Sequence, residues 1–395
     1  MLEDIFNKLE PEVSAAVRKE KNEDYCSMHL LSNDTLGHIF GYVGEKNYLF
    51  VACVSNRFHQ VYVETFGVET LTSIGKIAVL SVSCAKLCLD STNRLDRLDR
   101  LDRLDRLDRS PYATALFKRA AWYGKLEVLK WGQESGYELH TVLFDMHVIG
   151  MAAKNGHLEV VRYLRKLGSP WNHWTCSNAA GNGHLKVLTW VRANGCPWNE
   201  HTCANAALNG HLIVLKWARA NGCLWDEWTC SHAAEKGHLK VLQWTRANGC
   251  PWNKETCSRA AEKGHFKLLK WARANGCPWN EQTCAYAVLY GDFVVLKWVR
   301  ANGCPWDEMS CSRAAWRGDL AVLKWLRANG CPWNEGACSR AAMCGHLTVL
   351  KWLRANGCPW DRETYKFALQ DGDPELIRYV NDQGCPPPLF DDFDY

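Results

Sequence analysis

The sequence has no apolar run that approaches the roughly 18 residues of a membrane-spanning helix. Its first residues, MLEDIFNKLEPEV, lack the basic and apolar stretches of a secretory signal. The charge is nearly balanced, because 47 basic residues stand against 43 acidic ones. We therefore expect neither membrane insertion nor a dedicated nucleic-acid surface. An intracellular location, cytoplasmic or nuclear, is expected, where the 20 cysteines would be free thiols.

Motifs of catalytic sites are missing as well. No repeated unit contains a nucleophile beside a base, and none contains a glycine-rich loop that binds phosphate. We therefore expect no enzyme and no cofactor, and function must depend on binding surfaces.

The dominant feature that is present is a repeat of 27 residues. Glycines mark the end of each unit at Gly195, Gly222, Gly249, Gly276, Gly303, Gly330, Gly357 and Gly384. A mid-unit series lies at Gly183, Gly210, Gly237, Gly264, Gly291, Gly318, Gly345 and Gly372, with Gly124 and Gly156 upstream, which gives ten units. A fixed period of this length indicates a solenoid whose stacked units share one core.

Each unit is predicted to be a helix pair. In residues 199–225, NEHTCANAALNGHLIVLKWARANGCLW, an Asn that suits an N-cap opens the first helix, which runs to the mid-unit glycine. The second helix ends at Gly222, where a left-handed C-cap fits. Its apolar residues cover a broad arc, as expected of a helix packed between neighbours. The predicted fold is all-α, an α-solenoid of stacked helix-turn-helix units over residues 111–386.

The units resemble ankyrin repeats at the pattern AAxxGHLxVLxW…NG, most literally at Ala233-Ala234 and Gly237-His238-Leu239. Ankyrin units have a period of about 33 residues. Here the connection GCPWN is too short for their projecting hairpin, so these look like shortened ankyrin-type units. Cys203 and Trp217, with their equivalents, stand where ankyrins usually have leucine. The resemblance implies a protein-binding module.

The repeated cysteines, histidines and tryptophans have structural explanations. Two series of cysteines suggest zinc, but thiols on helices stacked about 8–10 Å apart cannot crowd around one ion at the required Zn–S distance of about 2.3 Å. We expect them to be small buried hydrophobic side chains, with no metal. The histidines after the mid-unit glycines are interpreted as capping residues, because Asp292 and Asp319 replace two of them. Tryptophan and arginine series suggest base-reading repeats, but arginines that lie over apolar surface are favoured.

The region before the repeats has three parts. Residues 1–29 are predicted to be a helical segment, and residues 30–66 a compact helical module. Residues 67–110 are predicted to form a helical connector that ends in an RLD repeat, which is interpreted as a solvated linker, with a specific binding segment as the alternative. After the repeats, residues 387–395 are an acidic tail that we expect to be disordered.

Residues 30–66 resemble the F-box, a helical module that docks onto a Skp1-type adaptor in cullin–RING ubiquitin ligases. The resemblance lies in Leu31, Asp34, Leu36, Ile39, Phe40, Tyr42, Val43, Val54, Arg57 and Phe58. It implies that Leu31, Leu36, Ile39, Phe40, Val43, Val54 and Phe58 contact the adaptor. The sequence departs from the family at Ser32, where a proline is usual. A plain helical cap on the solenoid is the alternative.

The predicted binding surface lies on the first helix of each unit. Cys203, Ala206 and Ala207 and their equivalents share one face, whereas positions 201, 205 and 208 lie together on the opposite face and vary between units. These varying positions are rich in residues typical of binding hot spots. The predicted partner-binding residues are Trp174, His201, Asn205, Trp228, His232, Arg259, Tyr286, Arg313, Trp316 and Arg340.

Two functions follow from these features. In the first, a monomeric recognition protein binds a partner protein on this surface and delivers it to a ubiquitin ligase through the F-box-like segment. In the second, the chain is an interaction scaffold with no link to a ligase. A zinc-binding or nucleic-acid-binding repeat protein is a more distant alternative.

Overall fold

The computed structural model describes residues 82, 85–86, 111–137, 145–290 and 293–387. The segments at 1–29 and 30–66, nearly all of the connector at 67–110, and residues 388–395 of the acidic tail lie outside these residues. The corresponding assignments, including the F-box-like module, therefore stay predictions.

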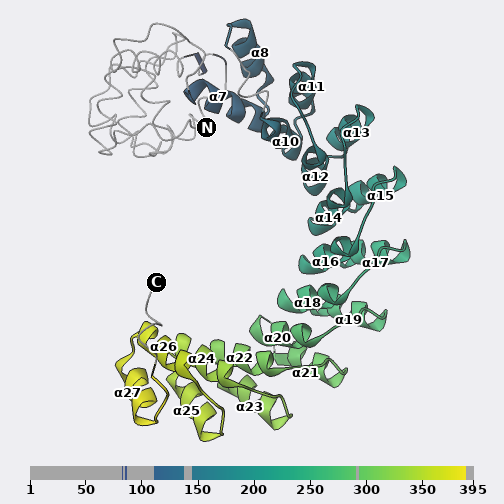
Figure 1. Ribbon diagram of the computed structural model, residues 1–395. Coiled ribbons are helices and arrows are strands. Elements are labelled where there is room, and N and C mark those ends of the chain that lie inside the picture. The colour runs from purple at the N-terminus through teal and green to yellow at the C-terminus, as the bar shows by residue number, and fades with distance from the viewer. Residues whose placement is uncertain (1–81, 83–84, 87–110, 138–144, 291–292, 388–395) are drawn as a thin grey trace, which may run out of the picture. The chain divides into compact units, whose positions relative to one another are not determined.

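The described part of the chain is all-α, with twenty helices in ten pairs (Figure 1). In chain order the pairs are α7 (Pro111–Trp122) and α8 (Leu126–Glu134), α10 (Met146–Lys154) and α11 (Leu158–Lys166), α12 (His173–Gly181) and α13 (Leu185–Ala193), α14 (Glu200–Leu208) and α15 (Leu212–Ala220), α16 (Glu227–Glu235) and α17 (Leu239–Ala247), α18 (Lys254–Glu262) and α19 (Phe266–Ala274), α20 (Glu281–Leu289) and α21 (Phe293–Ala301), α22 (Glu308–Trp316) and α23 (Leu320–Ala328), α24 (Glu335–Met343) and α25 (Leu347–Ala355), and α26 (Arg362–Asp371) and α27 (Pro374–Asp382). The predicted fold class and the number of repeated units are confirmed.

The chain divides into two compact units. Unit 1 comprises residues 1–179 and 186–196, and unit 2 comprises residues 180–185 and 197–395. Helices α7 to α11 belong to unit 1, and helices α14 to α27 belong to unit 2.

The pair α16 and α17 shows why the sequence forms two short helices. The Asp226 side chain accepts a hydrogen bond from the Trp228 amide at 3.1 Å, and Glu227 lies in the first turn, next to the positive end of the helix dipole. Helix α16 ends before Gly237, whose φ of 74° is easily adopted only by glycine. Helix α17 ends in the same way before Gly249, at φ 80°. The predicted N-caps and left-handed glycines are therefore confirmed in this pair.

Within unit 2 the helices form two rows (Figure 1). Each first helix contacts the first helix of the next pair, from α14 through α26, and also its own second helix. The first helices approach closely because the faces between them carry small residues such as Cys230, Ala233 and Ala234, all fully buried. The second helices carry bulky tryptophans and lie farther apart, so in this unit the first helices line the inner side of the curve.

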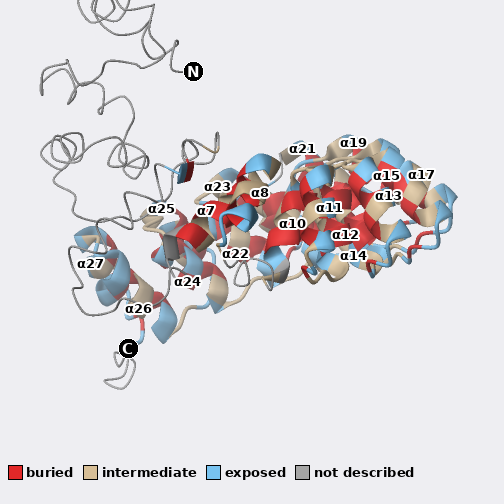
Figure 2. Ribbon diagram, turned by 90° about the horizontal axis from the view of Figure 1, so that it is seen from above, coloured by how far each residue is buried: buried red, intermediate tan, exposed pale blue. Residues whose placement is uncertain are grey.

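Buried cysteines fill much of the core. Fifteen of the sixteen described cysteines are buried, and all sixteen are free thiols. The thiol after each second helix donates to the carbonyl of an N-cap residue, as Cys223 does to Asn199 O at 3.3 Å. Figure 2 shows the buried residues concentrated inside the helix stack. The cysteines are thus small core residues that also satisfy a buried carbonyl.

Among the described residues, no helix combines the length and the apolar character needed to cross a membrane.

Candidate partner-binding surface

The positions nine, five and two residues before each mid-unit glycine form one surface, which we call the first-helix face. In α16 these residues are Trp228, His232 and Glu235. Trp228 is 43% exposed, whereas Cys230 on the opposite side of the helix is fully buried. Packing between neighbouring first helices therefore buries the constant residues and leaves the variable ones accessible.

The structure places all ten predicted partner-binding residues on this face, and none of them is buried. The exposed members are Trp174, His201, Trp228, Trp316 and Arg340. The half-buried members are Asn205, His232, Arg259, Tyr286 and Arg313. Their role in binding stays a prediction.

In the middle of unit 2, the face is held together by contacts between neighbouring helices. Arg259 of α18 forms an ion pair with Glu235 of α16 at 2.8 Å, and its guanidinium lies 5.8 Å from the centre of the Trp228 ring. Trp228 also packs against His232, with ring centres 5.7 Å apart. These side chains therefore present a fixed surface whose positive charge is balanced by a carboxylate.

Nearer the C-terminal end of unit 2, aromatic and sulfur contacts replace the ion pair. The Arg313 guanidinium of α22 lies 4.5 Å from the centre of the Tyr286 ring of α20. Arg340 of α24 donates from Nη1 to Met343 Sδ at 3.5 Å. Neither arginine has a carboxylate within ion-pair distance in the described part of the chain.

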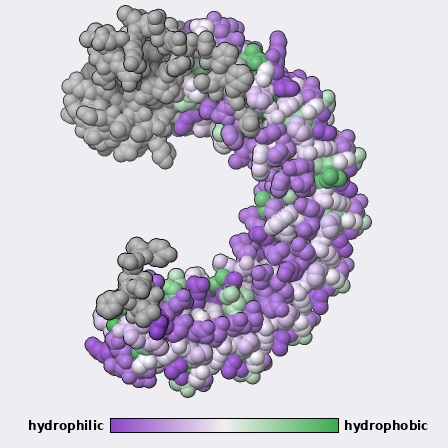
Figure 3. All heavy atoms as spheres, in the orientation of Figure 1, coloured by the Kyte–Doolittle hydropathy of each residue, from purple (hydrophilic) through white to green (hydrophobic). Residues whose placement is uncertain are grey.

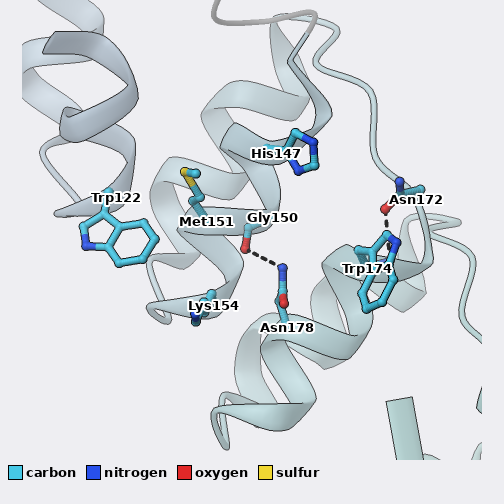
Figure 4. A pocket seen from close by; sticks show the side chains of 8 residues that line it. All are labelled: Trp122, His147, Gly150, Met151, Lys154, Asn172, Trp174 and Asn178. Carbon is cyan, nitrogen blue, oxygen red and sulfur yellow. Dashed lines mark hydrogen bonds between the residues drawn. The ribbon is translucent and has the colours of Figure 1, made fainter. Parts of the chain in front are cut away.

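In unit 1 the equivalent surface forms a shallow pocket (Figure 4). Trp174 and Asn178 line it together with His147, Met151 and Trp122. Asn178 donates from Nδ2 to Gly150 O at 3.4 Å, so it links α12 to α10.

Of the eight residues that line this pocket, the list of predicted partner-binding residues contains only Trp174. His147, Met151 and Lys154 lie nine, five and two residues before Gly156, and Trp122 lies two before Gly124. The mid-unit glycine therefore gives the register that would have identified them. The 32-residue spacing from Gly136 to Gly168 interrupts the regular period there.

The repeated histidines are not caps, so that interpretation was wrong. The side chains of His157, His211, His238, His265 and His346 make no capping hydrogen bond. Instead, His265 Nε2 donates to Glu235 O of the preceding pair at 3.0 Å, and His346 Nε2 donates to Trp316 O at 3.1 Å. The carbonyls can only accept, so Nε2 carries the proton. Each such histidine fastens one helix pair to the pair before it.

Where Asp319 replaces the histidine, one residue caps the helix and another links the helix pair to the preceding pair. Asp319 does cap its helix, because its carboxylate accepts from Val322 N at 3.0 Å. The link to the preceding pair comes from Arg317, whose Nη1 donates to Val288 O at 2.6 Å. A cap alone therefore does not supply the contact between pairs.

These histidines give the stability a defined pH dependence. Burial lowers the pKa of His211 and His238, which bond to Gly181 and Leu208 carbonyls, and of His232. The unfolded chain, with histidine pKa values of about 6.5, therefore binds more protons than the folded chain just below that pH. The stabilisation from these histidines is fully present above the histidine pKa of the unfolded chain. It is lost as the pH falls toward their lowered pKa values in the folded chain.

We expect the denaturant concentration at the unfolding midpoint to decrease as the pH is lowered from about 7.5 to about 5.5. The measurements stop at about pH 5.5. Burial raises the pKa of Asp226 and Asp307, so at lower pH these carboxyl groups would also take up protons. The matched variant His238→Gln keeps a donor but cannot titrate, so its midpoint should depend less on pH. An equal dependence in wild type and variant would contradict this origin.

The arginines and tryptophans of the second helices contact the tryptophans of the connections between pairs. The Arg219 guanidinium lies 4.0 Å from the centre of the Trp225 ring and also donates to Cys223 O. Trp198 and Trp217 pack edge to face, with ring centres 6.0 Å apart. The predicted placement of arginine over apolar surface is confirmed, and these cations stabilise the connections between helices.

The described residues contain no cluster of metal-ligating side chains, and the pKa values of two buried thiols are raised. No three His, Cys, Asp or Glu side chains come together there as a metal site requires. Hydrogen bonding to Cys223 and burial raise the pKa of the Cys203 thiol, and burial raises that of Cys385 to about 11. Such thiols stay protonated and are poor nucleophiles or ligands.

The described residues thus define an α-solenoid of helix pairs with a variable surface on its first helices. Residues 149–192 match the family model "Ankyrin repeats (many copies)", so this segment is similar to ankyrin repeats, as the resemblance predicted. No curated protein matched the chain. The match does not include residues 30–66, so the F-box resemblance stays a prediction.

Two solved structures are similar in their arrangement of helices. One is the pentatricopeptide repeat protein PPR10 in complex with an 18-nt psaJ RNA element, with a TM-score of 0.43, 13% identity, and 98% of this chain and 63% of that chain covered. The chain thus spans less than two thirds of that protein's length. The other is the human ASB11 ankyrin repeat domain, with a TM-score of 0.35, 16% identity, and 43% of this chain and 85% of that chain covered.

Proposed function

We propose that the chain is a non-enzymatic recognition protein that binds a protein partner on its first-helix face. The observation that carries this proposal is the distribution of exposed large hydrophobic residues. Seven of the ten in the described part of the chain lie on first helices or their C-caps, namely Trp174, Trp228, Tyr290, Met309, Trp316, Met343 and Leu369. The other three, Ile213, Leu224 and Val294, lie on second helices or a connection.

The type of residue separates the two surfaces as well. Every exposed Trp, Tyr and Met in this set belongs to the first helices or their C-caps, and aromatic residues dominate the energetics of protein interfaces. The residues elsewhere are aliphatic. On the side of the molecule shown in Figure 3, isolated hydrophobic residues lie in a mainly hydrophilic surface. Such a surface suits a partner that contacts several separate anchors.

The test is quantitative affinity capture with the full chain as bait. We expect Tyr286→Ala/Trp316→Ala to weaken the capture of genuine partners about thirtyfold, because two anchors are truncated. The matched control Ile213→Ala/Val294→Ala removes exposed hydrophobic residues from second helices and should change nothing. Partners retained by the first variant, or lost equally from both, would rule out the first-helix face.

A finer proposal is that the partner is delivered to a cullin–RING ubiquitin ligase through residues 30–66. It is supported by the F-box-like sequence pattern, and the alternative is a scaffold with no ligase link. Binding of purified Skp1-type adaptor should require Leu36 and Phe40, so Leu36→Ala/Phe40→Ala should lose adaptor binding while keeping the solenoid folded. No adaptor binding by the wild type would leave the scaffold as the function, and equal binding by wild type and variant would show that the F-box-like residues are not the contact.

A further inference from the structure

Charge is distributed unevenly along the first-helix face of unit 2. In α16 and α18 the position two residues before the mid-unit glycine is Glu235 or Glu262, and these carboxylates pair with Arg259 and Lys263 at 2.8 and 2.7 Å. The residues that occupy the place of Glu235 before Arg313 and Arg340 are Leu289 of α20 and Trp316 of α22. The change of residue removes the carboxylate that would neutralise the neighbouring arginine.

On the first-helix face of unit 2, Arg313 and Arg340 have no carboxylate partner in the described part of the chain. Arg313 stacks on Tyr286 at 4.5 Å, and Arg340 donates to the weak acceptor Met343 Sδ at 3.5 Å. The nearby acids Glu308 and Glu335 lie in the first turns of α22 and α24, and neither pairs with these arginines. The planar guanidinium groups are held by soft contacts that leave N–H donors for a ligand.

Exposed apolar side chains surround the two arginines. Met309 and Trp316 of α22 are 48% and 41% exposed, and Met343 of α24 is 43% exposed. We call the group formed by Tyr286, Met309, Arg313, Trp316, Arg340 and Met343 the arginine–aromatic subface. Its helices α20, α22 and α24 contact one another in sequence, so the residues lie on one continuous surface.

The chemistry of this subface fits a carboxylate-bearing ligand with aromatic or large apolar side chains. Arginine binds carboxylates in a bidentate manner, and aromatic rings and methionine accept flat apolar groups. Nucleic acid is disfavoured because its backbone needs a longer track of cations, and the adjoining α16 and α18 carry Glu235, Glu255 and Glu262 on the same face. A protein segment is therefore the appropriate ligand.

The spacing of the arginines indicates the form of that segment. They occupy equivalent positions on adjacent helices, which lie about 8–10 Å apart. An extended chain covers this distance in about three residues at about 3.3 Å per residue. Carboxylates about three residues apart, with an aromatic or large apolar residue between them, would reach both arginines and the surface between them.

We propose that the arginine–aromatic subface binds an extended acidic segment of a partner protein, with one carboxylate on Arg313 and another on Arg340. This inference rests on the proposed function, because it names the partner chemistry for part of the first-helix face. It also orients the partner along the solenoid, because the acidic segment of the partner binds α22 and α24 and not α16 and α18.

The test is a selection from a random peptide library displayed on phage, with the folded full chain as the target. Peptides selected by wild type should be enriched in Asp and Glu together with Phe, Tyr or Trp. The best peptide, fluorescently labelled, should bind Arg313→Glu/Arg340→Glu at least about tenfold more weakly, and the loss should shrink at high salt. The control Lys240→Glu/Lys267→Glu makes the same change in net charge on exposed positions of second helices, so it should keep wild-type affinity.

Three results would overturn the proposal. Selected peptides without an excess of acidic residues would do so, as would an equal loss from the arginine and lysine variants. Acidic peptides that bind only after residues 388–395, PLFDDFDY, are deleted would identify that acidic segment of the chain as the occupant. If selected peptides bind Tyr286→Ala/Trp316→Ala as tightly as wild type, the proposed function itself fails. Non-acidic peptides that lose affinity for that variant leave the proposed function standing and reject only the acidic ligand.

Discussion

Gly237→Ala is expected to lower the free energy of unfolding by about 2–3 kcal/mol. A φ of 74° costs a non-glycine residue about 1–2 kcal/mol. In addition, a Cβ atom on Gly237 would lie 2.7 Å from Cε1 and Nδ1 of His265 in the next helix pair. The ring must move, which breaks its hydrogen bond to Glu235 O, worth about 0.5–1.5 kcal/mol.

Gly264→Ala is the matched control for this substitution. Gly264 has a φ of 70°, yet no atom of the described residues lies within 4 Å of a Cβ built there. Its substitution should therefore cost the backbone term alone, about 1–2 kcal/mol. Denaturant unfolding of both variants isolates the histidine contact, and the extra cost at Gly237 should vanish in a His265→Ala background. Equal costs at the two glycines in wild type would show that the ring contributes nothing.

Ala261→Leu is expected to destabilise the array by about 3 kcal/mol, at the upper end of the usual cost of overpacking. Ala261 is fully buried on α18, and α18 contacts both α16 and α20. Three additional carbon atoms can therefore be accommodated only if the first helices separate. Ala274→Leu is the control in the same helix pair, because Ala274 is exposed at the end of α19.

The control should change stability by no more than about 0.5 kcal/mol. Unfolding midpoints followed by circular dichroism give the comparison. If Ala261→Leu unfolds at the wild-type midpoint, close packing of small residues is not what brings the first helices together.

The sequence was sufficient to predict the helix pairs because their ends depend on local chemistry. An N-cap such as Asp226 and a left-handed glycine such as Gly237 act within a few residues of themselves. The buried and accessible sides of each first helix were also predictable, because successive helical residues are rotated by about 100° and residues two apart therefore point to nearly opposite sides. Trp228 and Cys230 lie on opposite sides for this reason.

Contacts between pairs were not predictable in the same way. His265 bonds to a carbonyl 30 residues earlier, and the period alone does not show which group of the preceding pair a side chain reaches. The local sequence, a polar residue before a helix, suggests a cap just as well. The unpaired charge of Arg313 and Arg340 was also hidden, because it depends on which side chains face each other across neighbouring helices. The pocket residues of unit 1 were missed because the register changes at the 32-residue spacing.

The histidine link has a consequence for how such a chain changes length. Where the histidine is present, a pair offers the next one a carbonyl and a bare glycine, and its own histidine covers the same two groups of its predecessor. Pairs of this kind therefore carry matching ends. Recombination that gains or drops a whole 27-residue period joins surfaces that already fit, so the array can be shortened or extended without inventing a new junction. Gain or loss of a unit then changes which variable residues the first helices present to a partner, while the packing between units stays the same.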